Sequence, residues 1–121
     1  MKIILSTTEP DIDAPVDPRF GRGAYLTVVD TDTLEWQAYP NPGVNASGGA
    51  GVQAAQFAAR QKVSAVISGD FGPNAFDTLR AAGIAMYLYL PGVATARAVT
   101  EQFKAQALIP AGAATVPGHH G

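Results

Sequence analysis

Three short apolar runs, separated by helix-forming stretches, constrain the fold of this chain more than any other feature. They are KIILST (2–7), VSAVIS (63–68) and IAMYLYL (84–90). Each has the length and the continuous apolar character of a strand that is buried on both faces. Strands of this kind occur in parallel sheets covered by helices, so the chain is predicted to be an α/β protein.

The segments between these runs complete the expected order of elements. AYLTVVD (24–30) and EWQAYP (35–40) are rich in β-forming residues and flank a turn-forming stretch, which predicts a hairpin. Helices are expected over 52–61, within 72–83 and over 94–106. The order β-β-β-α-β-α-β-α then predicts a mixed five-stranded sheet of order 3-2-1-4-5, in which strand 2 is antiparallel.

Length and composition favour a single domain. The chain has 121 residues, of which 47% are apolar and 15% charged, so it can bury one core and is too apolar to be disordered. We expect a domain over 1–108 and a flexible Gly/Pro/His tail over 109–121. No apolar run reaches the ~18 residues of a membrane span. The apolar part of the start is too short for a signal peptide, so a cytoplasmic location is expected.

Cysteine content and charge exclude several kinds of chemistry. The sequence has no cysteine, which excludes disulfides, thiolate zinc sites and cysteine-ligated iron–sulfur clusters. The net charge of −2 offers no basic surface to nucleic acid. No Ser-His-Asp arrangement is visible, and KIILST lacks the carboxylate that a two-metal nuclease needs on its first strand. We expect a protein that is not an enzyme and that binds neither nucleic acid nor a membrane.

The unusual residues of the chain are expected to meet at one edge of the sheet. In the predicted topology strands 1, 3, 4 and 5 all end there, and ligands of open α/β sheets bind beyond the carboxyl ends of strands. The loops that gather at this edge, called the loop rim below, are 8–23, 41–51, 69–73 and 91–93. They hold most of the Gly and Pro residues, together with Arg19 and Arg22. The loop rim is the predicted binding site.

Two strand-to-helix junctions supply candidate backbone donors. NASGGAGVQ (45–53) and GDFGPN (69–74) each place glycines before a helix, whose first N–H groups and positive dipole end attract anions. Glycine lets a bulky ligand approach the backbone, although a tight turn is an alternative interpretation. Ser47 could cap the helix or donate to the ligand, and no lysine follows as it would in a nucleotide phosphate loop. The candidate residues are Asn45, Ser47, Gly48, Gly49, Gly51, Gly69, Asp70, Gly72 and Asn74.

Arg19 and Arg22, in DPRFGRG, are the candidate cations of the loop rim. A guanidinium stays charged and donates hydrogen bonds in a planar fork, which suits the edges of a sulfide or oxyanion ligand. The alternative is a salt bridge to Asp13, Asp17 or Asp70. The Asp70 carboxylate would repel an anion, so it is also a candidate for orienting an arginine, binding a cation or capping a turn.

The two histidines are the remaining candidate metal ligands. His119 and His120 lie in the predicted tail, where a solvated role is the alternative to a transient metal contact. Packing in the core or on a sheet face is expected for Phe20, Trp36, Met86, Tyr87 and Tyr89.

Three segments together resemble a known family. They are VDPRFGRGAYLTVVDTDT, SGGAGVQAAQ and SGDFGPNAFDTLRAAGI. In order and spacing, over roughly residues 1–108, they are similar to the dinitrogenase iron–molybdenum cofactor biosynthesis family, which includes NifX-type proteins and the carboxyl-terminal domain of NifB proteins.

The resemblance implies a three-layer α/β/α, ribonuclease-H-like fold without nuclease activity. It also implies a carrier for an anionic metal–sulfur cluster, such as the iron–molybdenum cofactor or an iron–sulfur precursor. Proteins that donate or accept the cluster are then the expected partners, and a monomer or weak homodimer the expected state. Without cysteine, the cluster would be held by backbone amides and arginines, with a histidine as a further candidate.

Two other functions fit the sequence. One is a regulatory module that responds to a small anion or a nucleotide. The other is a structural protein that dimerises through an exposed edge strand such as 35–40.

Overall fold

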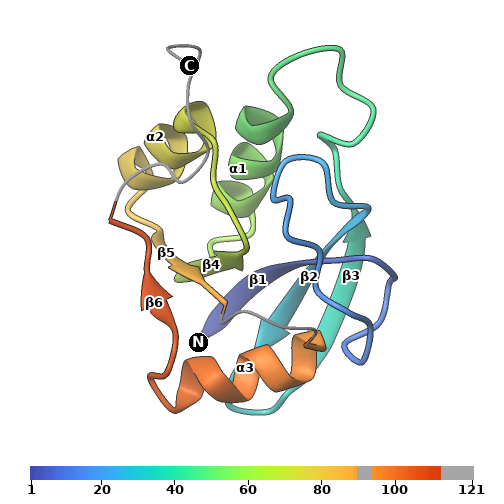
Figure 1. The fold of residues 1–121 in the computed structure, drawn as a ribbon, viewed down its shortest axis with the longest axis vertical. Coiled ribbons are helices and arrows are strands. Elements are labelled where there is room, and N and C mark those ends of the chain that lie inside the picture. The colour runs from blue at the N-terminus through green and yellow to red at the C-terminus, as the bar shows by residue number, and fades with distance from the viewer. Residues whose placement is uncertain (90–93, 113–121) are drawn as a thin grey trace.

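One mixed sheet with helices on both faces organises the chain (Figure 1). The computed structural model describes residues 1–89 and 94–112. The strands there are β1 (Lys2–Thr7), β2 (Tyr25–Asp30), β3 (Trp36–Pro40), β4 (Ala65–Ser68), β5 (Ala85–Leu88) and β6 (Ile109–Pro110). The helices are α1 (Ala50–Arg60), α2 (Pro73–Ala81) and α3 (Ala96–Lys104).

The strand order confirms the predicted topology and adds one strand to it. The sheet has the order β3-β2-β1-β4-β5-β6, in which β2 is antiparallel to both neighbours and β1, β4 and β5 are parallel. β6 lies in the segment expected to be a flexible tail and pairs antiparallel with Tyr87 and Leu88. It is held there because Leu108 is buried and the Ala111 N–H donates to the Met86 carbonyl at 2.9 Å. Residues 113–121 of the predicted tail lie outside the described residues.

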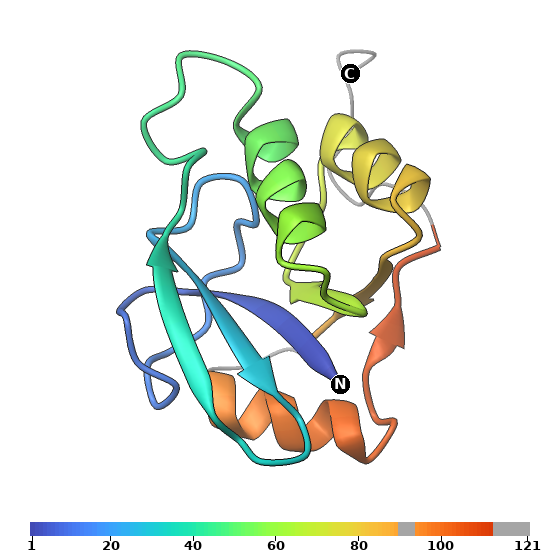
Figure 2. The same cartoon turned by 180° about the vertical axis from the view of Figure 1, so that it is seen from behind.

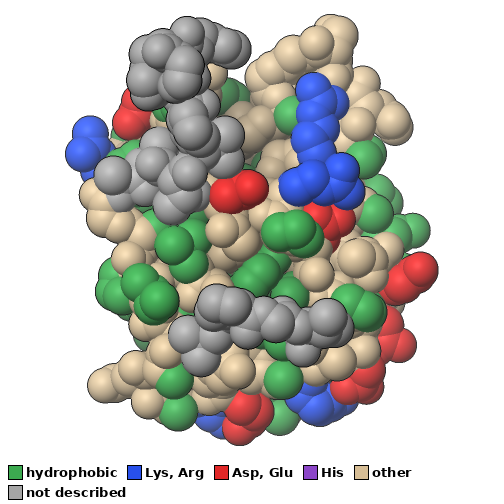
Figure 3. Space-filling view, viewed as in Figure 1, with side chains coloured by type: hydrophobic (Ala, Val, Ile, Leu, Met, Phe, Trp, Pro, Cys, Tyr) green, Lys and Arg blue, Asp and Glu red, His purple; other side chains and the backbone are tan. Residues whose placement is uncertain are grey.

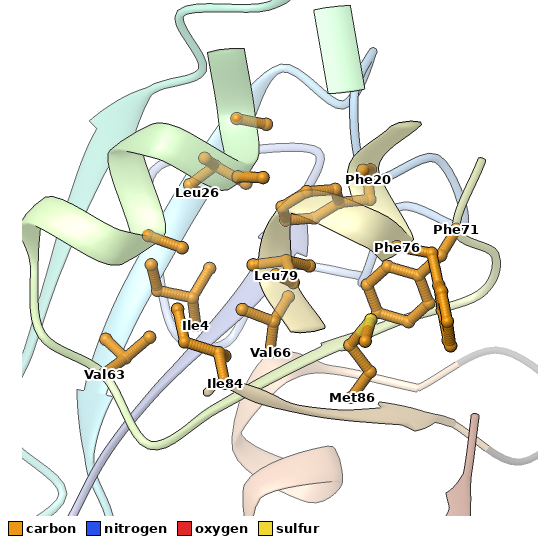
Figure 4. Close-up of a cluster of buried hydrophobic side chains, with 14 of the residues drawn as sticks. Ile4, Phe20, Leu26, Val63, Val66, Phe71, Phe76, Leu79, Ile84 and Met86 are labelled. Atoms are coloured by element: carbon orange, nitrogen blue, oxygen red, sulfur yellow. The ribbon is translucent and has the colours of Figure 1, made fainter. Parts of the chain in front are cut away.

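An aromatic and aliphatic core fills the space between the sheet and the helices α1 and α2. Phe20, from the loop before β2, is 1% exposed and stands 5.5 Å from the Phe71 ring, measured between ring centroids. Figure 4 shows both rings in one cluster with Leu79 and Met86. The expected core positions of Phe20 and Met86 are therefore confirmed. Because the buried residues of α1 are all alanines, that helix can lie close to the sheet.

The opposite face of the sheet packs against α3, which completes the three layers (Figure 2). Tyr87 meets the Phe103 ring edge-on at 5.3 Å, as expected for a sheet-face residue. Trp36 differs from expectation, because it lies on the edge strand β3 and its exposed fraction is 40%. Among the described residues, no helix has the length and apolar character needed to span a membrane.

Candidate functional site

Three of the four predicted rim loops meet. Arg19, in the segment 15–23 that we call the arginine loop, forms a parallel backbone bridge with Asp70. Arg22 of the same loop donates from Nη1 to the Ala46 carbonyl at 2.9 Å, in the segment 41–49 that we call the glycine loop. Figures 1 and 2 both show the arginine loop beside the first turn of α1. Residues 91–93, the fourth loop, lie outside the described residues.

The start of α1 has donors without protein acceptors. Its N-cap is Gly49, at φ 69°, no side chain caps the helix, and its first turn has no acidic residue. Within the described chain, no acceptor pairs with the backbone N–H groups of residues 50–52. Ser47 is exposed and does not provide the cap considered from the sequence, and Asn45 is also exposed. The described residues therefore leave the positive dipole charge of this helix end uncompensated.

The start of α2 repeats the arrangement and lies against the start of α1. Its N-cap is Gly72, again without a side-chain cap or an acidic residue in the first turn. Gly51 and Ala75 show that the two first turns touch, since a Cβ built on Gly51 would lie 3.0 Å from the Ala75 Cβ. Asn74, in the first turn of α2, is exposed. Two like dipole ends placed side by side repel each other, and an anion between them would offset this cost.

The five predicted glycines fall into two groups. A Cβ on Gly48, Gly49 or Gly72 would meet no atom of the described residues within 4 Å, so these positions are open with respect to that part of the chain. A Cβ on Gly69 would lie 2.7 Å from the Pro18 Cα, and Gly51 is constrained by α2 as described above. The open group suits the approach of a ligand, whereas Gly51 and Gly69 are explained by close packing.

Arg22 keeps its charge unpaired at the rim. Among the described residues, no carboxylate forms an ion pair with its guanidinium, which instead donates to the carbonyls of Ala46 and, at 3.5 Å, Gly43. The salt bridge considered from the sequence is therefore not formed by Arg22, and its charge is available to an anion.

Arg19, in contrast, forms the predicted alternative. Its Nε and Nη2 atoms each lie 3.1 Å from a carboxylate oxygen of Asp17, whose side chain is 6% exposed. Pro18 turns the chain so that Asp17 also accepts from the Arg19 backbone N–H at 2.9 Å. Asp17 neutralises much of the positive charge that the sequence assigned to the rim at position 19.

Asp70 makes the same side of the rim acidic. Burial raises the pKa of its carboxyl, the Asp17 carboxylate raises it further, and Arg19 lowers it. Asp17 binds the Arg19 guanidinium directly, whereas Asp70 is affected by the charge of Arg19 without an ion pair between these two described residues. Figure 3 shows acidic side chains next to basic ones on this face, so charge is mixed there. The anion-attracting part of the rim consists of the helix starts and Arg22.

Polar side chains hold the arginine loop, and of these the sequence pointed only to Tyr89, as a residue expected to pack on a sheet face. Ser6 Oγ donates to the Asp17 carbonyl at 2.6 Å and Ser68 Oγ to the Pro18 carbonyl at 3.3 Å. The hydroxyl of Tyr89 also donates to the Asp17 carbonyl, and burial raises the pKa of Tyr89 to about 12. Asn41, 2% exposed, contacts this loop from the glycine loop. Its place before a Pro-Gly turn is the only sequence signal for such a role.

Histidines, clusters of metal ligands and surface hollows are the other features at which a ligand could bind. His119 and His120 lie outside the described residues. Over residues 1–89 and 94–112, no three His, Cys, Asp or Glu side chains gather as a metal site requires. Two surface hollows, of about 320 and 710 Å³, lie beside Trp36 and beside Phe103 and contain no predicted site residue.

Comparison with known proteins decides the family. The sequence matches the model of the dinitrogenase iron-molybdenum cofactor family over residues 1–106. The chain belongs to this family. Membership relates it to the biosynthesis of that cofactor, as the resemblance in the sequence indicated. A comparison with curated protein sequences gave no match.

Solved structures agree with the family. The apo form of the orange protein from Desulfovibrio gigas is 34% identical, with a TM-score of 0.88 over 95% of this chain and 96% of that one. A protein provisionally assigned as NifB, from Thermotoga, is 25% identical, with a TM-score of 0.79 over 99% and 98%. A protein provisionally assigned as a dinitrogenase, from Methanocaldococcus jannaschii, shares the fold at 16% identity and a TM-score of 0.67, over 93% and 96%.

Proposed function

We propose that this chain binds an anionic metal–sulfur cluster at the loop rim and carries it without catalysing a reaction. The cluster would be the iron–molybdenum cofactor or an iron–sulfur precursor of it. The observation that carries the proposal is that two uncapped helix starts lie side by side. The guanidinium of Arg22 is bound to the glycine loop beside them, and no carboxylate of the described residues pairs with it. Each helix end stabilises an anion by about 0.3–1 kcal/mol, and by up to ~2 kcal/mol where it is partly buried.

The donor chemistry fits a cluster that arrives with its own sulfide. In a chain without cysteine, cluster iron has no thiolate to bind, so the protein would hold the sulfide surface rather than the metal. Backbone N–H groups and a guanidinium donate hydrogen bonds to such a surface. The open backbone at Gly48, Gly49 and Gly72 allows a bulky ligand to come near. Asn45, Ser47 and Asn74 are exposed polar residues beside it.

Binding of tetrathiomolybdate, a stable anion of molybdenum and sulfide, tests the proposal. Under anaerobic conditions the protein should retain the coloured anion through gel filtration, with molybdenum measured by elemental analysis. Arg22→Ala should weaken retention about tenfold, because it removes a charge-assisted hydrogen-bond donor. Arg60→Ala removes an exposed charge in the last turn of α1 and serves as the matched control.

The outcomes separate the proposal from its alternatives. A wild-type protein that retains no probe would refute the proposal, and equal losses in both variants would point to nonspecific charge attraction. A rise in melting temperature with phosphate or ATP, but not with the probe, would favour the small-anion module. Donor and acceptor proteins are proposed partners, and they would be sought only after the probe is shown to bind.

A further inference from the structure

We infer that Asn41 is a positioning residue of the loop rim, which holds the arginine loop and the glycine loop in one fixed arrangement. The inference rests on the proposed function, since the arrangement matters only if the rim binds a ligand. Asn41 is 2% exposed and bonds to both loops. Its Nδ2 donates to the Phe20 carbonyl at 2.9 Å, and its Oδ1 accepts from the Gly43 N–H at 2.9 Å.

The backbone of Asn41 is also fully engaged. Its N–H donates to the Ala24 carbonyl at 3.1 Å, and its carbonyl accepts from the Val44 N–H at 3.1 Å. A buried amide that uses both ends of its side chain specifies one geometry, because any displacement leaves a buried polar group without a partner. Asn41 thus fixes the position of Phe20, and with it the start of the turn that carries Arg22.

The segments joined by Asn41 touch through their backbones. A Cβ on Gly43 would lie 2.4 Å from the Ala50 carbonyl oxygen and 2.6 Å from that of Gly21. A Cβ on Gly21 would lie 2.8 Å from the Gly51 nitrogen. With no side chain between them to absorb a shift, a displacement of either loop reaches the first turn of α1 directly.

The carbonyls of the arginine loop are turned into the protein. Those of Asp17 and Pro18 accept from the hydroxyls described above, and that of Arg19 accepts from the Gly23 N–H at 2.9 Å. The Phe20 carbonyl accepts from Asn41. Four consecutive carbonyl oxygens are therefore kept away from an anion at the rim, and Asn41 supplies the last of these bonds from the neighbouring loop.

The substitution Asn41→Asp removes one hydrogen bond between the two loops without changing the size of the side chain. Aspartate has the same shape and still accepts from Gly43, but its ionised carboxylate cannot donate to the Phe20 carbonyl. We expect the affinity of the folded variant for tetrathiomolybdate to fall at least about tenfold, because a buried hydrogen bond is lost and a negative charge is added; the affinity of the uncharged Asn41→Ser should fall about tenfold through the lost bond alone. Thr100→Val is the matched control, since it removes a buried hydroxyl that donates to the Ala96 carbonyl within α3.

The experiment measures affinity, unfolding in urea and amide resonances by two-dimensional NMR, on the full chain. Asn41→Asp should weaken binding and shift the resonances of residues 45–52, whereas Thr100→Val should lower stability without either effect. Wild-type affinity and unshifted resonances in Asn41→Asp would overturn the inference, as would equal loss of affinity in the control. If wild type fails to bind the probe, the proposed function is refuted, and the resonances still decide whether Asn41 couples the loops. Should Asn41→Asp not fold, Asn41→Ser is measured in the same way.

Discussion

Gly72, the N-cap of α2, offers a substitution that should change stability and ligand affinity in opposite directions. Its backbone, at φ −69° and ψ 165°, already has the extended geometry of a capping residue, and a Cβ there would meet no atom of residues 1–89 and 94–112 within 4 Å. In Gly72→Asp the new carboxylate would accept from the first N–H groups of α2. These are the donors that the proposed function assigns to the anion.

The gain in stability follows from three terms. Replacing glycine at a compatible backbone contributes about 0.4–1 kcal/mol, the better cap a few tenths, and the charge at the helix start about 0.3–1 kcal/mol. Repulsion from Asp70, two residues away, offsets part of this sum, so we expect a net gain of about 1 kcal/mol. For 121 residues the entropy of unfolding converts this into a rise in melting temperature of about 4 °C.

Calorimetry and probe titration test both effects on the same samples. Gly72→Asp should melt higher than wild type and bind tetrathiomolybdate at least about tenfold more weakly, because the donors are occupied and a negative charge is added. Gly72→Ala stiffens the same position without an acceptor, so any loss of affinity that it shows comes from its methyl group, and Gly72→Asp should bind the probe more weakly than Gly72→Ala. A stabilised Gly72→Asp that keeps wild-type affinity would show that the ligand does not use the start of α2.

Two further predictions concern the acidic and the packed sides of the rim. Because the fold raises the pKa of Asp70, its ionised form lowers stability above that pKa, and the cost disappears where the carboxyl is protonated in both states. Asp70→Asn should therefore raise stability against urea at neutral pH and lose this gain below the ordinary value of 3.8; a gain that persists in acid would contradict this cause. Gly69→Ala should destabilise by about 1–3 kcal/mol through overpacking against Pro18, whereas Gly48→Ala, in open space, should change stability little. Equal melting temperatures for these two variants would show that the packing distinction is wrong.

Local patterns were sufficient for most of the fold. A strand buried on both faces needs a continuous apolar run. KIILST and VSAVIS therefore predicted β1 and β4 without reference to the rest of the chain. The hairpin pattern and the right-handed crossover rule then gave the relative directions of the first five strands, which the sheet confirms. β6 could not be foreseen, because a two-residue strand ending in Pro110 has no local signal and exists through its pairing with β5.

The candidate site was less accessible to sequence reasoning. Arg19 and Arg22 are three residues apart in one loop, yet one is paired with Asp17 and the other donates to Ala46, 24 positions along the chain. Spacing cannot separate them, because the choice depends on which acceptor the folded chain brings within reach. The bond of Asn41 to the Phe20 carbonyl is likewise seen only in the folded chain, since the sequence offers no more than its place before a Pro-Gly turn.

The order of residues alone determined where strands and helices form and which loops share an edge, since both follow from local periodicity and the handedness of the chain. The tertiary structure decided which glycines stand open and which are packed. It also decided that Arg19 pairs with a carboxylate, whereas Arg22 has no carboxylate partner among the described residues. The packing of the glycines and the bonds of Arg22 depend on contacts between segments far apart in the sequence, which only the folded chain establishes. The pairing of Arg19 is local, because Asp17 is two residues away, but the sequence does not say that this partner is the one chosen.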